Sequence, residues 1–147
     1  MGLSIYLACT VRGDRGAVSV LRTLAGALEE MGHTILSRHL LDDDVDSAES
    51  ALGERDVFIR DIEWLEQCDV LVAEASGSSF GVGFEVGYVL GRSDRTSQRV
   101  ILMYGTTRRN QISRLIVGNA HPRCDVVAYD DPASLMTALT NLLKPKA

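Results

Sequence analysis

Glu85 is the only charged residue in an apolar stretch of the sequence, Phe80-Gly-Val-Gly-Phe-Glu-Val-Gly-Tyr-Val-Leu-Gly91. Burying a carboxylate costs several kcal/mol unless it is paired or hydrogen-bonded, so its presence here needs a reason. An apolar run over residues 70–73 and a Gly/Ser loop over residues 76–79 come just before it, which places Glu85 in the first turns of a helix. In α/β folds this position binds ligands and carries chemistry. The alternative is a glutamate that only complements the helix dipole.

Asp61 is a second carboxylate at an unexpected position. In a helix predicted over residues 51–67 it shares one face with three apolar side chains, Phe58, Ile62 and Leu65. Neighbouring Arg60 is predicted to lie off this face, in solvent. Asp61 either caps a loop from within or meets Glu85 in one cleft, where their repulsion would raise one pKa above the other. An ionised nucleophile beside a protonated acid is the pair that cleavage at an anomeric carbon requires.

A polar loop, Thr10-Val-Arg-Gly-Asp-Arg-Gly16, follows the first apolar run of the chain. Arg12 and the amides of this loop are suited to holding a phosphate, although Arg12 also fits an ordinary solvent-exposed position. Ser78 and Ser79 add hydroxyls and free N–H groups at the start of the next helix. Gly81-Val-Gly83 is not a dinucleotide fingerprint, because the third glycine position, 86, is valine.

Other polar residues allow two interpretations each. Tyr6 is either a core aromatic or a hydroxyl that reaches a carboxylate at the end of the sheet. The three histidines lack the spacing of metal ligands, and a lone histidine such as His39 is usually structural. The run Asp42-Asp43-Asp44 is most simply a solvated loop, with a metal site as the weaker alternative. No cofactor and no metal are predicted.

Length and composition predict a single domain over residues 1–147. The net charge of −5 argues against a general nucleic-acid binder but allows a small anionic ligand. Three widely spaced cysteines without a CxxC pair indicate neither a disulfide framework nor a zinc site, and favour a reducing, cytoplasmic location: Cys9, Cys68 and Cys124. We expect no signal peptide and no membrane helix.

Predicted strands alternate with predicted helices along the chain. The strands cover residues 4–10, 34–37, 70–74, 100–103 and 125–129, and the helices cover 18–31, 51–67, about 83–92, 112–117 and 132–143. This order predicts an α/β fold: a flavodoxin-like, doubly wound, five-stranded parallel sheet with helices on both faces. Its ligand site should lie outside the carboxyl ends of the first and third strands.

The chain resembles the 2′-deoxynucleoside 5′-phosphate N-hydrolases of the nucleoside 2-deoxyribosyltransferase superfamily. Four segments carry the resemblance, in order along most of the chain: residues 6–12, Arg60-Asp-Ile-Glu-Trp-Leu-Glu-Gln-Cys-Asp-Val-Leu-Val-Ala-Glu74, Ser79-Phe-Gly-Val-Gly-Phe-Glu-Val-Gly87 and residues 112–118. These enzymes cut the bond between base and deoxyribose in a nucleoside monophosphate. Two departures are Cys9, where the family commonly has glycine, and residues 40–55, which align poorly and leave the base preference open.

The resemblance implies a role for each matching residue. Glu85 would attack C1′ and form a glycosyl ester, Asp61 would protonate or steer the departing base, and Tyr6 would hydrogen-bond Glu85 and disfavour a 2′-hydroxyl. The positions that would surround the 5′-phosphate are Thr10, Arg12, Ser79 and Gly81. Ser113 would reach the phosphate from the other subunit of a homodimer, and His39 would line the base pocket.

Two alternatives remain open at this point. A nucleoside deoxyribosyltransferase would use the same carboxylates but pass the sugar to a second base. A catalytically silent nucleotide sensor would keep the fold alone, and fold does not separate it from an enzyme. In each case the expected partner is a small nucleotide or nucleoside, rather than a nucleic-acid polymer or a membrane.

Overall fold

The structure of the chain, a computed structural model, describes residues 2–145 and contains one five-stranded sheet. All strand pairs are parallel and the order is β2-β1-β3-β4-β5, which confirms the predicted flavodoxin-like topology. The strands are β1 (Ser4–Ala8), β2 (Thr34–Ile35), β3 (Val70–Glu74), β4 (Arg99–Gly105) and β5 (Cys124–Tyr129).

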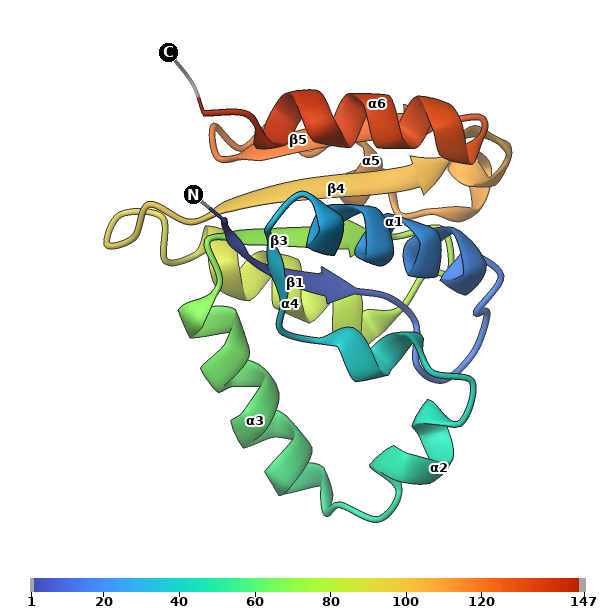
Figure 1. The fold of residues 1–147 in the computed structure, drawn as a ribbon, viewed down its shortest axis with the longest axis vertical. Helices are drawn as coiled ribbons and strands as arrows, with labels where there is room; N and C mark the ends of the chain where they lie inside the picture. The colour runs from blue at the N-terminus through green and yellow to red at the C-terminus, as the bar shows by residue number, and fades with distance from the viewer. Residues whose placement is uncertain (1, 146–147) are drawn as a thin grey trace.

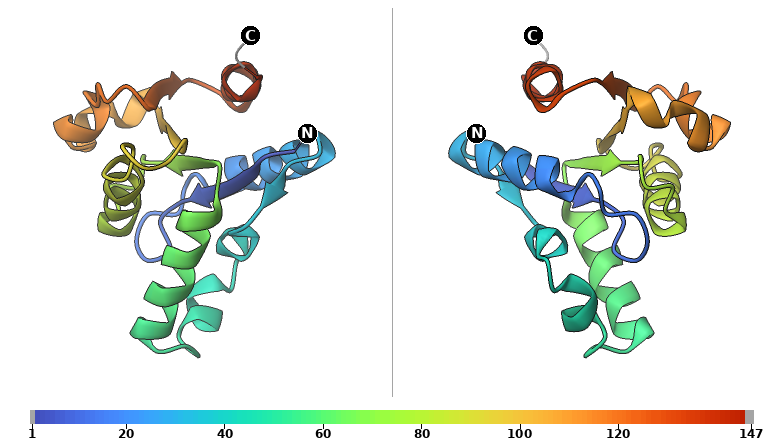
Figure 2. Two further views of the ribbon diagram at one scale, coloured as in Figure 1. Left: turned by 90° about the vertical axis from the view of Figure 1, so that its left-hand side faces the viewer. Right: turned by 90° about the vertical axis from the view of Figure 1, so that its right-hand side faces the viewer.

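Helices cover both faces of the sheet. Figures 1 and 2 show α1 (Val18–Glu30) and α6 (Pro132–Leu143) on one face. The other face carries α3 (Glu54–Gln67), α4 (Phe80–Leu90) and the short α5 (Arg114–Val117). Strands buried on both sides can be apolar throughout, and residues 70–73 are accordingly buried without a break.

The two helices on the first face, α1 and α6, each bury one stripe at helical spacing. The buried leucines are Leu21, Leu24 and Leu28 in α1, and Leu135, Leu139 and Leu143 in α6. Asp131 caps α6, because its carboxylate accepts a 2.7 Å bond from the Ser134 amide, and Pro132 occupies the first turn. These signals are local, and α6 has the predicted bounds.

The segment over residues 41–50 differs from the predicted loop. It holds the end of a 3₁₀ helix, η1 (Arg38–Leu41), and a short helix, α2 (Val45–Glu49), while Asp42–Asp44 between them are exposed. The side chain of Val45 is buried, so α2 is anchored by tertiary contact rather than by helix propensity. A second 3₁₀ helix, η2 (Thr106–Gln111), precedes α5.

Helix α3 does not bury the predicted apolar face along its whole length. Leu65 is its one buried residue, and Phe58 is 55% exposed. The first half of α3 extends away from the sheet (Figure 1), and the ring of Phe58 there lies 6.4 Å, between centroids, from that of Phe84 in α4. Arg60, expected in solvent, is instead half-buried.

The loops after β1 and β3 leave the sheet side by side. The two strands pair from Ile5–Val70 to Ala8–Ala73, so residues 9–17 and 75–79 begin at the same edge. A Cβ on Gly77 would lie 2.3 Å from Thr10 Oγ1 and 2.6 Å from the Asp14 carbonyl oxygen. Only glycine permits this contact, which fixes the two loops relative to each other.

Candidate active site

A cavity of about 700 Å³ opens at the carboxyl ends of β1 and β3, at the predicted place. Its walls come from the loop after β1, from η1 and α2, from α3, and from the loop and first turns of α4. The lining residues are Cys9, Val11, Arg12, Gly13, Leu40, Glu49, Ser50, Leu52, Glu54, Val57, Asp61, Gly77, Ser78, Ser79, Phe80, Gly81, Val82 and Glu85. We call Glu49, Asp61 and Glu85 the acidic end, and Ser78, Ser79 and Gly81 the amide end.

Glu85 lies in the second turn of α4 and, within residues 2–145, has one side-chain hydrogen-bond partner. The hydroxyl of Tyr6, fully buried in β1, donates to Glu85 Oε1 over 3.1 Å. Burial raises the pKa of Glu85 to about 8, with a smaller upward contribution from the Asp61 charge, while the Tyr6 hydrogen bond opposes the shift. Of the two expectations for Tyr6, the structure shows the hydroxyl that reaches a carboxylate.

Asp61 faces the same cavity from α3. Its Oδ1 accepts two hydrogen bonds from Arg60, over 2.8 Å from Nη2 and 3.0 Å from Nε. Burial raises the pKa of Asp61, the Arg60 charge counteracts this, and the Glu49 charge adds to it. The structure therefore brings the two carboxylates together as expected, and both pKa values rise.

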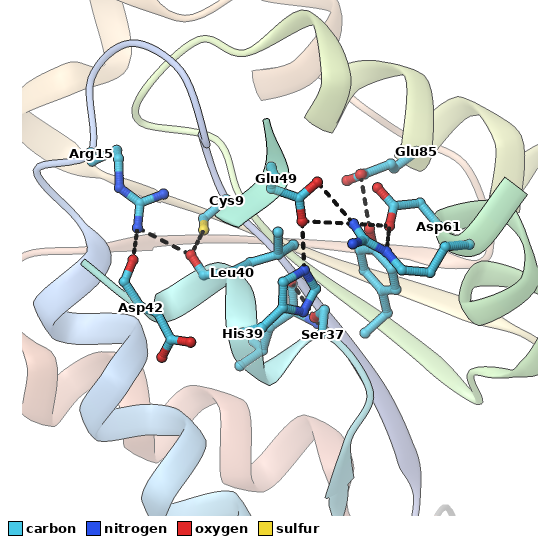
Figure 3. Close-up of polar contacts among 12 residues, drawn as sticks. Cys9, Arg15, Ser37, His39, Leu40, Asp42, Glu49, Asp61 and Glu85 are labelled. Atoms are coloured by element: carbon cyan, nitrogen blue, oxygen red, sulfur yellow. Dashed lines mark hydrogen bonds and ion pairs between the residues drawn. The ribbon is translucent and has the colours of Figure 1, made fainter. Parts of the chain in front are cut away.

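Glu49 and Arg60 extend this acidic end in a way that the sequence did not predict. Arg60 donates to Glu49 as well as to Asp61, and His39 Nε2 donates to Glu49 Oε1 over 2.8 Å (Figure 3). The guanidinium of Arg60 also lies over the Trp64 ring, 4.9 Å from its centroid. Trp64 follows Arg60 by one helical turn, which is a signal that the sequence offered; the position of Glu49 had none.

The amide end is formed mainly by backbone. Ser79 is the N-cap of α4, where its hydroxyl accepts from the Val82 amide over 3.4 Å, and Gly81 lies in the first turn. Ser78 has a φ of 53°, an uncommon conformation for a residue other than glycine. The free N–H groups of a helix start form a ready site for an anion.

Arg12 and Thr10, both expected to surround a phosphate, have other contacts in this structure. Arg12 lines the cavity, but its Nε donates to Asp46 of α2 over 2.9 Å and its side chain is 77% exposed. Thr10 does not line the cavity; its hydroxyl faces Gly77.

His39 and Ser113 lie outside the cavity wall. His39 stands behind Glu49 and against Trp64, with 5.2 Å between ring centroids. Ser113 is the exposed N-cap of α5 and lines a neighbouring hollow of about 400 Å³, which it shares with Ser79 and Phe80.

The remaining expectations concern cysteines, metals and membranes. Cys9 and Cys68 are buried, Cys124 is half-buried, and all three are free thiols. Among residues 2–145 no three His, Cys, Asp or Glu side chains gather as a metal site. Over the same residues, no helix combines the length and the apolar character needed to cross a membrane.

Comparison with known proteins relates this chain to a family. Residues 5–136 match the profile described as nucleoside 2-deoxyribosyltransferase. A protein of Thermofilum pendens named 2′-deoxynucleoside 5′-phosphate N-hydrolase 1 is 40% identical over 141 residues, which cover 96% of this chain and 95% of that protein. The 5-hydroxymethyl-dUMP N-hydrolase of Danio rerio is 30% identical over 131 residues, or 88% of each chain.

A solved structure shares the fold. The CMP N-glycosidase BcmB of Clostridium botulinum superimposes with a TM-score of 0.70 at 17% identity, over 95% of this chain and 99% of that one. The matched residues of the profile and of the two relatives span nearly the whole chain, including Asp61 and Glu85. The chain therefore belongs to the nucleoside 2-deoxyribosyltransferase family and, within it, to the 2′-deoxynucleoside 5′-phosphate N-hydrolases, which makes it an enzyme of the N-glycosidase class.

Proposed function

We propose that the chain hydrolyses 2′-deoxynucleoside 5′-monophosphates to the free base and deoxyribose 5-phosphate, through a glycosyl ester on Glu85. The observation that carries this proposal is the convergence of Asp61 and Glu85 on one cavity, with Tyr6 bonded to Glu85. A protein that only binds a phosphate gains nothing from two anions beside its ligand.

In the first step, a carboxylate oxygen of Glu85 attacks C1′ and the C1′–N bond breaks. The electron pair of that bond goes to the base nitrogen, and the base takes a proton from Asp61. A 2-deoxy sugar reaches an oxocarbenium-like transition state readily, because no 2-hydroxyl withdraws electrons.

In the second step, water attacks C1′ of the ester and the Glu85 carboxylate is released. Asp61, now ionised, is placed to accept the proton of that water, as the acid of a retaining glycosidase does. Glu85 acts in its ionised form. With a pKa of about 8, roughly a tenth of the free enzyme carries this form at pH 7, and the Tyr6 hydrogen bond favours it.

The amide end is the proposed site for the 5′-phosphate. The N–H groups at the start of α4, with the Ser79 hydroxyl, suit an anion, and Arg12 reaches it by exchanging Asp46 for the phosphate. Such an exposed ion pair is weak enough to exchange. The names of the two relatives support a phosphate, since both describe nucleoside monophosphates as substrates.

We also propose a homodimer in which Ser113 of each subunit completes the other's phosphate site. Large apolar side chains surround the hollow that contains Ser113: Phe80 is 99% exposed and Leu115 is 83% exposed. Exposed apolar patches of this kind mark interaction surfaces. Analytical ultracentrifugation of wild type and Leu115→Glu tests this, and a monomeric wild type contradicts it.

The function is tested by incubating the protein with dAMP, dCMP, dGMP and dTMP, with and without an acceptor base, and measuring free base by chromatography. Release without an acceptor supports hydrolysis. Exchange that requires the acceptor would instead support a deoxyribosyltransferase. Binding of the nucleotides without any turnover would leave a nucleotide sensor.

A further inference from the structure

Glu49 forms a wall of the cavity that the proposed chemistry does not use. It is the last residue of α2, its side chain is only 10% exposed, and it lines the cavity together with Asp61. Figure 3 shows its carboxylate near that of Asp61, and Arg60 bonds to both, although Glu49 and Asp61 come from different helices.

The hydrogen bonds of Glu49 fix its orientation. Its Oε1 accepts from His39 over 2.8 Å and forms an ion pair with Arg60 Nη2 at 2.9 Å, while Oε2 accepts from Arg60 over 3.2 Å. A carboxylate oxygen has room for about two hydrogen bonds, so Oε2 keeps one acceptor position. Both donors stand behind the wall, since neither Arg60 nor His39 lines the cavity.

The carboxylate oxygens of the acidic end can therefore accept hydrogen bonds from the base of a bound nucleotide. Glu49, Asp61 and Glu85 line one cavity, and from this we infer that a base attached to C1′ beside Glu85 has Asp61 and Glu49 within reach of its edge. An exocyclic amino group donates to such a carboxylate, and this charge-assisted bond is a strong one. A keto oxygen at the same position cannot donate a hydrogen bond, and two acceptors, this oxygen and the Glu49 carboxylate, then face each other, which is unfavourable.

We propose that Glu49 is the base-selecting residue of this enzyme, and that it favours nucleotides whose base carries an exocyclic amino group, such as adenine and cytosine, over their keto counterparts. This inference rests on the proposed hydrolysis of nucleoside monophosphates and names the substrate class of that same site. It gives a role to the segment over residues 40–55.

The test uses two substrate pairs that differ only in amino against keto: dCMP with dUMP, and dAMP with dIMP. In wild type, kcat/KM for the amino member should exceed that for the keto member by about tenfold or more. Glu49→Gln should bring the ratio close to one, because the amide can turn its N–H₂ toward a keto oxygen. Glu63→Gln, on the exposed face of α3, is the matched control and should keep the wild-type ratio.

Equal rates for the two members of each pair, or a keto preference, would overturn the proposal. So would a Glu49→Gln enzyme that is slower on every substrate with the ratio unchanged, since Glu49 would then only support the fold. Glu49→Asp, which keeps the charge but withdraws the acceptor by one methylene, replaces Glu49→Gln if that variant does not fold, and should also lower the ratio.

Equilibrium binding separates this inference from the proposed function. Glu85→Ala is titrated with each nucleotide pair by calorimetry, alone and combined with Glu49→Gln. A binding preference that Glu49→Gln removes, in a protein whose wild type releases no base, would overturn the hydrolysis and keep the assignment of Glu49. Turnover of monophosphates with equal binding of both members would do the opposite.

Discussion

The acidic end and the amide end of the cavity hold their polar groups in different ways. At the acidic end, buried and half-buried side chains bond to one another: Tyr6 to Glu85, and Arg60 to both Asp61 and Glu49. At the amide end the polar groups belong to the first turn of α4, and Arg12, which lines the cavity from the loop after β1, pairs with Asp46 in solvent.

This difference shows that the catalytic groups cost folding free energy, whereas the phosphate-binding groups do not. A carboxylate kept partly out of water has a raised pKa, as Glu85 does, and the fold must support it. The first N–H groups of a helix are uncharged and lack an intrahelical partner in any helix, so presenting them to a ligand does not require the fold to keep a charge out of water. Substitutions at the acidic end should therefore change the rate, and those around the amide end should change mainly the affinity.

The largest effect is expected for Glu85→Gln, which removes the nucleophile. Base release should fall by at least about 10³-fold, because no glycosyl ester can form. The measurement is single-turnover base release. A variant within threefold of wild type would show that the acidic end does not work as proposed.

The same variant should be more stable than wild type at alkaline pH. The pKa of Glu85 is raised in the folded chain, from 4.5 to about 8, so wild type loses stability as the pH rises through this window. The melting temperatures of the two proteins should coincide near pH 4 and separate by pH 8, with Glu85→Gln the higher. If wild type had the higher melting temperature at pH 8, Glu85 would not be a buried carboxylate with a raised pKa.

Asp61→Asn should have the next largest effect, a loss of about 10²-fold in kcat, because the leaving base no longer receives a proton. The pH–rate profile should lose the limb that comes from Asp61, and the remaining limb of Glu85 should lie at lower pH, because the Asp61 charge contributes to the raised pKa of Glu85. An unchanged profile with full activity would place Asp61 outside the reaction. Glu63→Gln serves again as the control on the same helix.

Tyr6→Phe should slow the reaction about tenfold at pH 7 through the ionisation of Glu85. For wild type, kcat/KM should follow a bell-shaped pH profile, because Glu85 must be ionised and Asp61 protonated, and the raised pKa of Glu85, about 8, defines one limb. Removing the hydroxyl removes a bond that favours the charged carboxylate, so the limb should move to higher pH. A uniform loss at every pH would mean that Tyr6 only shapes the sugar pocket.

Arg12→Ala should have the smallest effect, about a fivefold rise in KM for the monophosphate and none for the bare nucleoside, since one exposed cation is lost. Asp46→Ala is its counterpart, because it frees Arg12 from the ion pair and should lower KM for the monophosphate. An equal effect of Arg12→Ala on nucleotide and nucleoside would remove Arg12 from the phosphate site.

Much of the fold could be predicted because its signals are local. Asp131 and Pro132 fix the start of α6, and Gly32, with φ of 91°, follows the end of α1. The apolar strands and their alternation with helices then leave few topologies to choose from. The predictions were wrong where tertiary packing outweighs local signals: α2 lies within a segment predicted as a loop, and the first half of α3 is exposed.

The site shows the same division. Glu85 and Asp61 can be recognised in the amino-acid pattern, because a carboxylate within an apolar segment carries a desolvation cost that the segment itself reveals. The contacts of Glu49 and Arg12 could not be recognised in this way: Glu49 bonds to Arg60, 11 residues away, and Arg12 bonds to Asp46, 34 residues away. The strength of an ion pair depends on the distance between the charges in space, which no local pattern encodes.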